Sequence, residues 1–230
     1  MIYRRTPFAY GEWYHCYTRG VDKRVVYESE ADYRRYVQLM YLANDAQSIE
    51  RSSFNLNISH EDVLQRQRTS SLVTIGAYSL MPNHFHILLR EETEGGITRF
   101  MRKVGTGYTM YFNIKNKRVG NLFLKPFRSK HVPDDRYAQR VVQYIHFNAA
   151  ELFEPGWKSG IVRDRQALLA SLRAYSYSSL PDYYGHRRVE NGLLGADALK
   201  LFSGEPSSLE SLIRDYREYY LEAAKSGFDT

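Results

Sequence analysis

Ten residues, MPNHFHILLR at positions 81–90, join a turn to a strand that carries two histidines. The Pro-Asn pair predicts the turn, and the apolar run after it predicts the strand. Side chains alternate between the faces of a strand, so His84 and His86 lie on one face and Phe85 lies on the other. Two imidazoles side by side on one face can hold a divalent metal ion. The alternative is that both histidines only cover the exposed face of a sheet.

The composition is that of a globular protein with a basic surface. Its 230 residues suffice for one sizeable domain, or for a domain with an extension, and 43% of them are hydrophobic, which is enough for a packed core. The formal charge of +6 favours a polyanionic partner, of which nucleic acid is the commonest. The single cysteine, Cys16, excludes an intramolecular disulfide and a cysteine-based zinc cluster, and it suits the cytoplasm.

The hydropathy of the chain argues against secretion and against insertion into a membrane. Residues 1–10 contain no apolar segment of the kind found in signal peptides. No stretch approaches the roughly 18 uninterrupted apolar residues that a membrane helix needs. We therefore expect a cytoplasmic protein without membrane contact.

The order of the predicted elements indicates the fold class. Strands are predicted at 13–19, 72–80 and 84–90, with a short basic strand at 121–132. Helices are predicted after a capping box at 29–32, at 97–112, after the cap Asp134, and at 207–224. This order predicts an α+β fold in which helices pack on one face of an antiparallel sheet. A ferredoxin-like layout fits it, although periodicity alone does not select that layout.

The helix predicted after Asp134 carries an amide and a phenol that could complete a site with the two imidazoles. Tyr144 and Asn148 are four residues apart and share one face of that helix. If this face meets the strand with His84 and His86, the amide oxygen of Asn148 can complete a metal site. The Tyr144 phenol can then attack a phosphorus atom and form a phosphotyrosine. An unperturbed phenol has a pKa near 10, so the field of the cation must help to form phenolate.

Other interpretations of these residues remain open at this point. A tyrosine on an amphipathic helix is more often a core or rim residue than a nucleophile, and Asn148 can serve as a helix cap. Imidazoles prefer softer ions than Mg²⁺, so Mn²⁺ or another transition ion is chemically suitable. Zinc is the simpler expectation for the two histidines alone.

Five ordered segments carry a resemblance to a known family. The longest is AYSLMPNHFHILL at 77–89, and the others are YHCYTRG at 14–20, DYRRY at 32–36, YIHFN at 144–148 and YSYSS at 175–179. Together they resemble the single-tyrosine HUH transposases, and most closely the REP-associated tyrosine transposases. The resemblance covers residues 10–185. After Asn148 the chain continues Ala-Ala-Glu, where the family usually has Pro-Val-Arg.

The resemblance implies a fold, a site and an activity. It implies the ferredoxin-like HUH domain, metal binding by His84 and His86, a nucleophilic role for Tyr144 and a place for Asn148 in the metal site. Family members cut single-stranded DNA with a divalent metal, Mg²⁺ or Mn²⁺. They keep the 5′ phosphate on the tyrosine, release a 3′ hydroxyl and can rejoin strands. The REP-associated branch acts on palindromic hairpins of bacterial chromosomes, which implies hairpin DNA as the partner and a place at the nucleoid.

The resemblance also divides the chain. Residues 1–185 are the expected HUH domain, and the polar segment 45–70 is expected to be an insertion with a short helix near 61–67. Residues 186–230 are expected to form a C-terminal helical extension. The sequence leaves open whether the protein is a monomer or a homodimer.

Cations and aromatic rings near the expected site are suited to DNA. Single-stranded DNA needs positive charges for its phosphates and aromatic faces for its bases, and Phe123 and Phe127 interleave with cations here. The expected DNA-binding residues are Arg19, Lys23, Arg24, Lys125, Arg128 and Lys130. Each of them, taken alone, is more often an ordinary solvated charge.

Three functions compete on the sequence. The first is a metal-dependent DNA endonuclease and strand transferase. The second is a domesticated hairpin-binding DNA-binding or RNA-binding protein without cleavage, which would share the α+β architecture. The third is a replication initiator or relaxase, which shares the His-x-His chemistry. Both histidines, the tyrosine and the amide are present together, which favours cleavage, and the Met-Pro-Asn prefix favours the transposases.

Overall fold

Four antiparallel strands form the sheet, in the order β2-β3-β1-β4. The computed structural model describes residues 7–47, 58–195, 197–199, 214, 216 and 218–219. The strands are β1 (Trp13–Arg19), β2 (Val73–Met81), β3 (His84–Glu91) and β4 (Arg128–Val132). The three longer strands lie where the sequence predicts them.

β4 is shorter than the basic strand predicted at 121–132. Arg128–Val132 pairs with β1, whereas the preceding segment meets the end of β1 through an isolated bridge between Gly20 and Phe123. Pro126 has no amide hydrogen to donate to a ladder, which explains why regular pairing begins after it.

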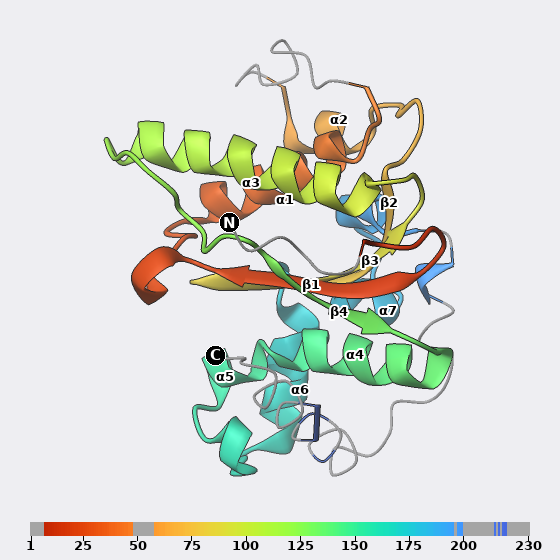
Figure 1. Cartoon of the computed structure of the whole chain (residues 1–230). Helices are drawn as coiled ribbons and strands as arrows, with labels where there is room; N and C mark the ends of the chain where they lie inside the picture. The colour runs from red at the N-terminus through yellow and green to blue at the C-terminus, as the bar shows by residue number, and fades with distance from the viewer. Residues whose placement is uncertain are drawn as a thin grey trace.

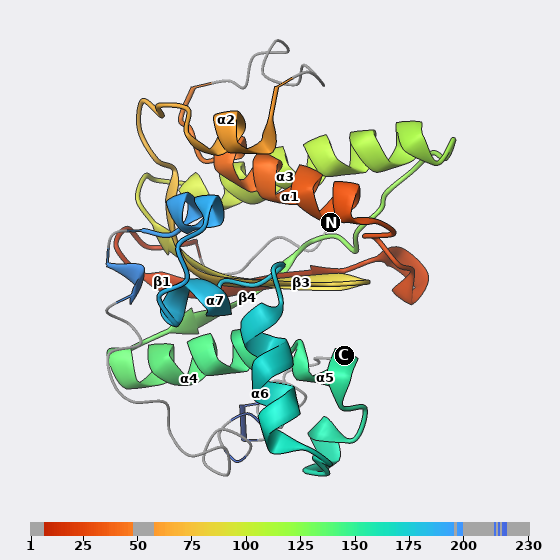
Figure 2. The same ribbon diagram turned by 180° about the vertical axis from the view of Figure 1, so that it is seen from behind.

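Helices cover both faces of the sheet (Figures 1 and 2). One side holds α1 (Glu30–Ala43), α2 (His60–Leu64) and α3 (Gly96–Lys115). The other side holds α4 (Asp135–Phe147), α5 (Ala150–Phe153) and α6 (Arg165–Ala174). The remaining elements with defined bounds are α7 (Leu180–Tyr183) and the 3-10 turns η1 (Val21–Lys23), η3 (Trp157–Ser159) and η4 (Val189–Leu193). No helix among the described residues is long and apolar enough to cross a membrane.

The α+β class is confirmed, but the expectation that helices pack on one face of the sheet is wrong. The physical reason is that β2 and β3 are apolar on both faces. Phe85 belongs to the core under α1 and α3, whereas Met81 and Leu88 are buried in the second cluster, with the apolar residues of α4. A strand that is apolar on both faces must be covered on both.

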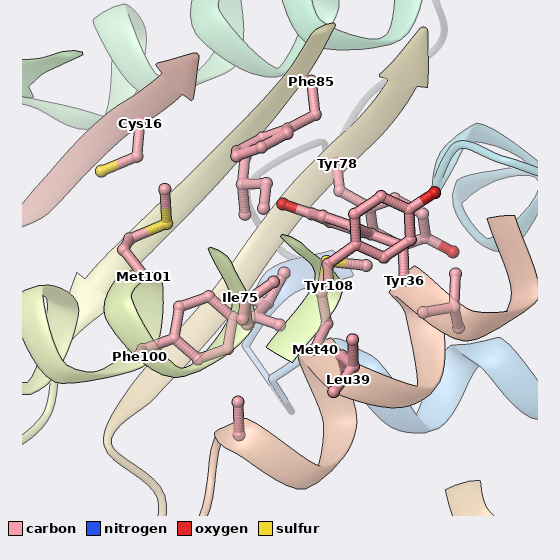
Figure 3. Packing of buried hydrophobic residues seen from close by; sticks show 14 of the residues in the cluster. Cys16, Tyr36, Leu39, Met40, Ile75, Tyr78, Phe85, Phe100, Met101 and Tyr108 are labelled. Carbon is pink, nitrogen blue, oxygen red and sulfur yellow. The ribbon is translucent and has the colours of Figure 1, made fainter. Parts of the chain in front are cut away.

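The core between the sheet and the α1–α3 pair is aromatic (Figure 3). The ring of Tyr36 in α1 lies 5.2 Å from the ring of Phe85 and 5.1 Å from that of Tyr108 in α3. Tyr108 donates its hydroxyl to the Val26 carbonyl at 2.6 Å, so this buried phenol keeps a hydrogen-bond partner. This core anchors one face of β1 and β3 and leaves their other face for chemistry.

Asp32 ties the start of α1 to the end of α3. As the predicted capping box requires, its carboxylate accepts the backbone N–H of Ser29 at 3.0 Å, and it also pairs with Lys115 Nζ at 2.7 Å. Burial opposes ionisation of Asp32, but hydrogen bonds from Lys115 and Tyr111 outweigh it and lower the pKa of this carboxyl. The two helices are therefore joined by charge as well as by apolar packing.

The chain after α7 returns to the edge of the sheet. Arg188 forms a largely buried ion pair with Asp182 at 2.6 Å, and the Gly195 amide donates to the Ile75 carbonyl of β2 at 3.0 Å. The η4 turn of this segment packs against α2, which lies in the predicted insertion.

The division of the chain stays a prediction. This holds for the boundary between 185 and 186 and for the insertion at 45–70. The helix predicted at 207–224 lies largely outside the described residues. The residues described there, Arg214, Tyr216, Glu218 and Tyr219, are helical.

Glu91, at the end of β3, caps the N-terminus of α3. Its buried carboxylate accepts the backbone N–H groups of Gly96 and Ile97 at 3.1 and 2.7 Å. Because negative charge is favourable at a helix N-terminus, we expect Glu91→Gln to lower the free energy of unfolding by about 1–2 kcal/mol in urea denaturation. The exposed neighbour Glu94 gives the matched variant Glu94→Gln, which should change it by less than about 0.5 kcal/mol. Equal effects of the two variants would contradict this role.

Candidate active site

Aromatic and basic side chains gather on the face of the sheet that α4 covers. The antiparallel register sets Tyr17 of β1 opposite His86 of β3, and Arg19 opposite His84. Since every second residue of a strand shares a face, His15 lies on this side as well. The sequence prediction that His84 and His86 share a face is borne out by this register.

His84 presents its Nε2 atom because Asn83 holds the other ring nitrogen. Asn83 Oδ1 lies 2.6 Å from His84 Nδ1, and the Asn83 amide nitrogen donates to the Lys23 carbonyl at 3.3 Å. The second bond fixes which end of the amide faces the histidine. An amide oxygen only accepts, so the proton of neutral His84 sits on Nδ1 and the lone pair on Nε2. Metal-ligating histidines are typically supported in this way from their second nitrogen.

His86 is buried and is held by another histidine. His15 Nε2 lies 2.9 Å from His86 Nδ1, and His15 Nδ1 lies 2.8 Å from the hydroxyl of Tyr219. Burial, together with the positive charge of Lys130, lowers the pKa of His15 to about 3, so His15 is neutral at physiological pH. A hydrogen-bonded row therefore runs from the C-terminal residues through His15 to the strand histidine.

A surface hollow of about 330 Å³ opens beside the two strand histidines. Its lining includes Tyr17, Arg19, Asp22, Lys23, His84, His86 and Arg128. The Tyr17 ring stacks on His86 with 5.7 Å between ring centroids. Burial raises the pKa of Tyr17 to about 12 although Arg128 opposes the shift, so this phenol stays protonated at neutral pH.

Tyr144 lies behind the hollow rather than in its wall. Its ring centroid is 5.5 Å from that of His86 and 5.7 Å from that of His15, so α4 brings the predicted nucleophile beside one predicted metal ligand, His86. The side chain is 0% exposed. Tyr216 stacks on it at 5.0 Å and Tyr219 lies at 4.4 Å, both from the described C-terminal residues. In this conformation Tyr144 is therefore close to the site and covered.

Asn148 ends α4, one turn after Tyr144. Its amide nitrogen donates to the Tyr144 carbonyl at 2.8 Å, and the side chain is buried. The capping role weighed from the sequence is thus present. The amide oxygen on the same group is the atom that could turn to a cation, so its part in a metal site stays a prediction.

The donors on this face fit a divalent cation with an incomplete protein shell. The rings of His84 and His86 lie 5.1 Å apart, and each has a partner on Nδ1. No group of three or more His, Cys, Asp and Glu side chains within the described ranges could hold a metal. Further ligands would therefore be oxygens of Asn148, water or DNA phosphate, and such a mixed set suits Mn²⁺ better than Mg²⁺.

The six cations expected to bind DNA are not equivalent in the structure. Arg19, Lys23 and Arg128 line the hollow with the histidines. Lys125 lines an adjoining groove of about 590 Å³ along α3, which shares Thr18, Phe85, Leu124 and Pro126 with the hollow.

The other two cations line neither the hollow nor the groove. Arg24 pairs with Asp22 at 3.4 Å. Lys130 lies over the rings of Tyr137 and Tyr219, at 5.3 and 5.1 Å from their centroids. The DNA-binding role of all six cations stays a prediction, and the structure favours the three in the hollow.

Sequence reasoning missed four residues of this face. His15 and Tyr17 could have been found, because they occupy alternate positions of a predicted strand, as His84 and His86 do. The sequence places Asn83 in the turn and gives no sign of its bond to His84. Tyr219 lies 204 residues from His15 in the sequence, and no local pattern signals their contact.

Comparison with known proteins identifies the family. Residues 32–148 match the model of the IS200-like transposases. This segment is half of the chain and contains both strand histidines, Tyr144 and Asn148, so the protein belongs to the IS200-like transposase family. No curated protein sequence matches the chain.

A solved structure has the same fold. It is that of a REP-associated tyrosine transposase bound to a REP hairpin, with a TM-score of 0.51 and 13% identity over 90% of this chain and 99% of that chain. At this identity the likeness concerns the fold. With the family match, it confirms the resemblance found in the sequence.

We expect acid to destabilise the domain through its buried histidines. Burial lowers the pKa of His15 and of His146 to about 3, with added effects of the nearby cations Lys130 and Arg188. The same side chains titrate near pH 6.5 in an unfolded chain. Below about pH 6.5 the unfolded state binds more protons, so the free energy of unfolding falls as pH falls, by up to roughly 1.4 kcal/mol per pH unit for each histidine.

Urea denaturation at several values between about pH 7 and pH 4 measures this loss. His146 bonds Ser179 Oγ at 2.7 Å, a contact that the amide of His146→Gln can keep. The free energy of unfolding of this variant should fall less between about pH 7 and pH 4 than that of wild type, by the contribution of one histidine. The exposed His131→Gln should retain the full effect. If His146→Gln and wild type lose stability equally with acid, the buried histidine is not the cause.

Proposed function

We propose that this protein is a metal-dependent endonuclease and strand transferase for single-stranded DNA, which cleaves beside hairpins through a 5′-phosphotyrosine on Tyr144. The observation that carries the proposal is the position of the Tyr144 ring, 5.5 Å from His86 on the sheet face that also holds His84. Membership of the IS200-like transposase family supports it. We expect the cation, Mg²⁺ or Mn²⁺, at His84, His86 and Asn148.

In the proposed step, Tyr144 Oη forms a bond to a DNA phosphorus while the bond from that phosphorus to the 3′ oxygen breaks. The phenol gives its proton to solvent, and the leaving oxygen takes up a proton and becomes a 3′ hydroxyl. The 5′ phosphate stays on the tyrosine until a 3′ hydroxyl attacks it and rejoins a strand. A cation bound beside the phosphate would neutralise its charge and favour the attack.

Tyr144 must be uncovered before it can react. Its ring is buried against Tyr216 and Tyr219, whereas the hollow that can receive a phosphate exposes His84, Arg19 and other lining residues. The reaction therefore requires a shift of the C-terminal aromatic residues or of α4. This requirement is also the observation that favours the second candidate, a hairpin-binding protein without cleavage.

Hairpin DNA with a single-stranded flank is the proposed substrate. The transposase of similar fold is bound to a REP hairpin, and we propose REP-like palindromes for this chain. Arg19, Lys23 and Arg128 in the hollow can contact phosphates, and Tyr17 can stack on an unpaired base. We propose that the protein acts at the nucleoid in the cytoplasm, as a monomer or a homodimer.

Covalent capture tests the chemistry. Wild type incubated with hairpin DNA from beside its own gene, in Mn²⁺ or Mg²⁺, should give a protein–DNA adduct on a denaturing gel. Tyr144→Phe should give none. Tyr17→Phe is the matched control, because Tyr17 also lies against His86 but is not the proposed nucleophile, and this variant should still form the adduct. Adduct formation by Tyr144→Phe would refute the assignment, and tight binding without adduct in both metals would favour the binding protein.

The salt dependence of hairpin binding tests the cations of the hollow. Loss of one phosphate contact lowers the slope of log K against log salt by about 0.7–0.9. We expect this change for Arg128→Gln, which removes a lining residue of the hollow. Arg99→Gln removes an exposed charge of α3, on the far side of the sheet, and should leave the slope unchanged. The same slope in Arg128→Gln as in wild type would exclude a phosphate contact at this residue.

A further inference from the structure

We propose that His15 is the positioning residue of the metal ligand His86. In this proposal His15 accepts the Nδ1–H of His86, which puts the lone pair of His86 on Nε2 for the cation. The inference rests on the proposed metal site. It adds a third histidine, from a different strand, that acts through the ligand and does not bind the metal.

The geometry around His15 supports this role. His15 is fully buried, and its ring lies at 25° to that of His86 with 5.0 Å between centroids. Both of its nitrogens are used, Nε2 with His86 Nδ1 at 2.9 Å and Nδ1 with the Tyr219 hydroxyl at 2.8 Å. The imidazole is therefore held at both ends and fixes the plane of His86.

The hydrogen-bond direction along this row decides whether His86 can bind a metal. A neutral imidazole donates from one nitrogen and accepts at the other. If His15 Nδ1–H donates to Tyr219, then His15 Nε2 accepts from His86, and the lone pair of His86 is on Nε2. If the Tyr219 hydroxyl donates instead, the row reverses and places a proton on His86 Nε2. Only the first direction permits a metal ligand there.

The two proposed ligands are therefore supported differently. His84 is held by the amide oxygen of Asn83, which can only accept, so its tautomer is fixed before any cation arrives. His86 is held by an imidazole that can accept or donate, so its tautomer is settled together with that of His15 and the orientation of the Tyr219 hydroxyl. Cation binding selects the arrangement in which His15 Nδ1–H donates to the Tyr219 hydroxyl and His86 Nδ1–H donates to His15.

Two substitutions separate hydrogen bonding from packing. His15→Phe keeps a ring in the buried site and removes both nitrogens. His15→Gln supplies an amide that can accept from His86 Nδ1. We expect His15→Phe to weaken Mn²⁺ binding about 10–100-fold, measured without DNA by the electron paramagnetic resonance signal of unbound Mn²⁺. His15→Gln should restore much of the affinity, and His131→Phe, an exposed histidine of β4, should match wild type.

A second measurement reads the tautomer of His86 directly in the wild-type protein. Imidazole ¹⁵N chemical shifts of the wild type with Mg²⁺ report which nitrogen of His86 carries the proton, and His15→Phe should alter this pattern. A His86 protonated on Nε2 in the saturated protein would overturn the inference, as would Mn²⁺ affinity unchanged in His15→Phe. Wild type that binds no Mn²⁺ would overturn the proposed metal site as well. Mn²⁺ binding that is independent of His15 would overturn this inference alone.

Discussion

Side chains alternate along β1 and β3, so one hydrogen-bonded register determines two surfaces at once. It sets His15 and Tyr17 beside His86 on the face under α4. It also sends Cys16 and Phe85 into the aromatic core under α1 and α3. A slip of a single residue would exchange the two sets. The packing of the aromatic core therefore holds the histidines in register, and Phe85 is the core side chain that also reaches the lining of the hollow.

The elements with strong local signals could be predicted from the sequence. The capping box at Ser29 and the Asp134 cap set helix boundaries through bonds between neighbours in the chain, and these bonds are present. The Pro-Asn turn lies between β2 and β3, as predicted. Whether helices pack on one or both faces of the sheet could not be predicted as well from the sequence. Leu88 and Met81 show that the histidine face also needs apolar cover, but interleaved polar residues hid this in the strand pattern.

The site also has a part that the sequence predicts and a part that depends on tertiary packing. His84 and His86 come from one strand, and their common face follows from spacing alone. The approach of Tyr144 to His86 depends on how α4 packs across the sheet, and spacing alone does not determine that packing. His15 and His86, which form the supporting hydrogen bond, are 71 residues apart in the sequence. Tyr219 is 204 residues from His15. Contacts between residues so far apart form only in the folded protein, so local sequence patterns cannot predict them.

The aromatic cover over Tyr144 has an optical consequence. The chain has two tryptophans, and Trp157 lies fully buried with its ring 5.6 Å from that of Tyr216. The other, Trp13, lies on β1 beneath the guanidinium of Arg90. Indole emission responds to the polarity around the ring, so departure of Tyr216 from Trp157 would change the emission of this tryptophan. The molecule thus contains its own fluorescent reporter of whether the tyrosine is covered.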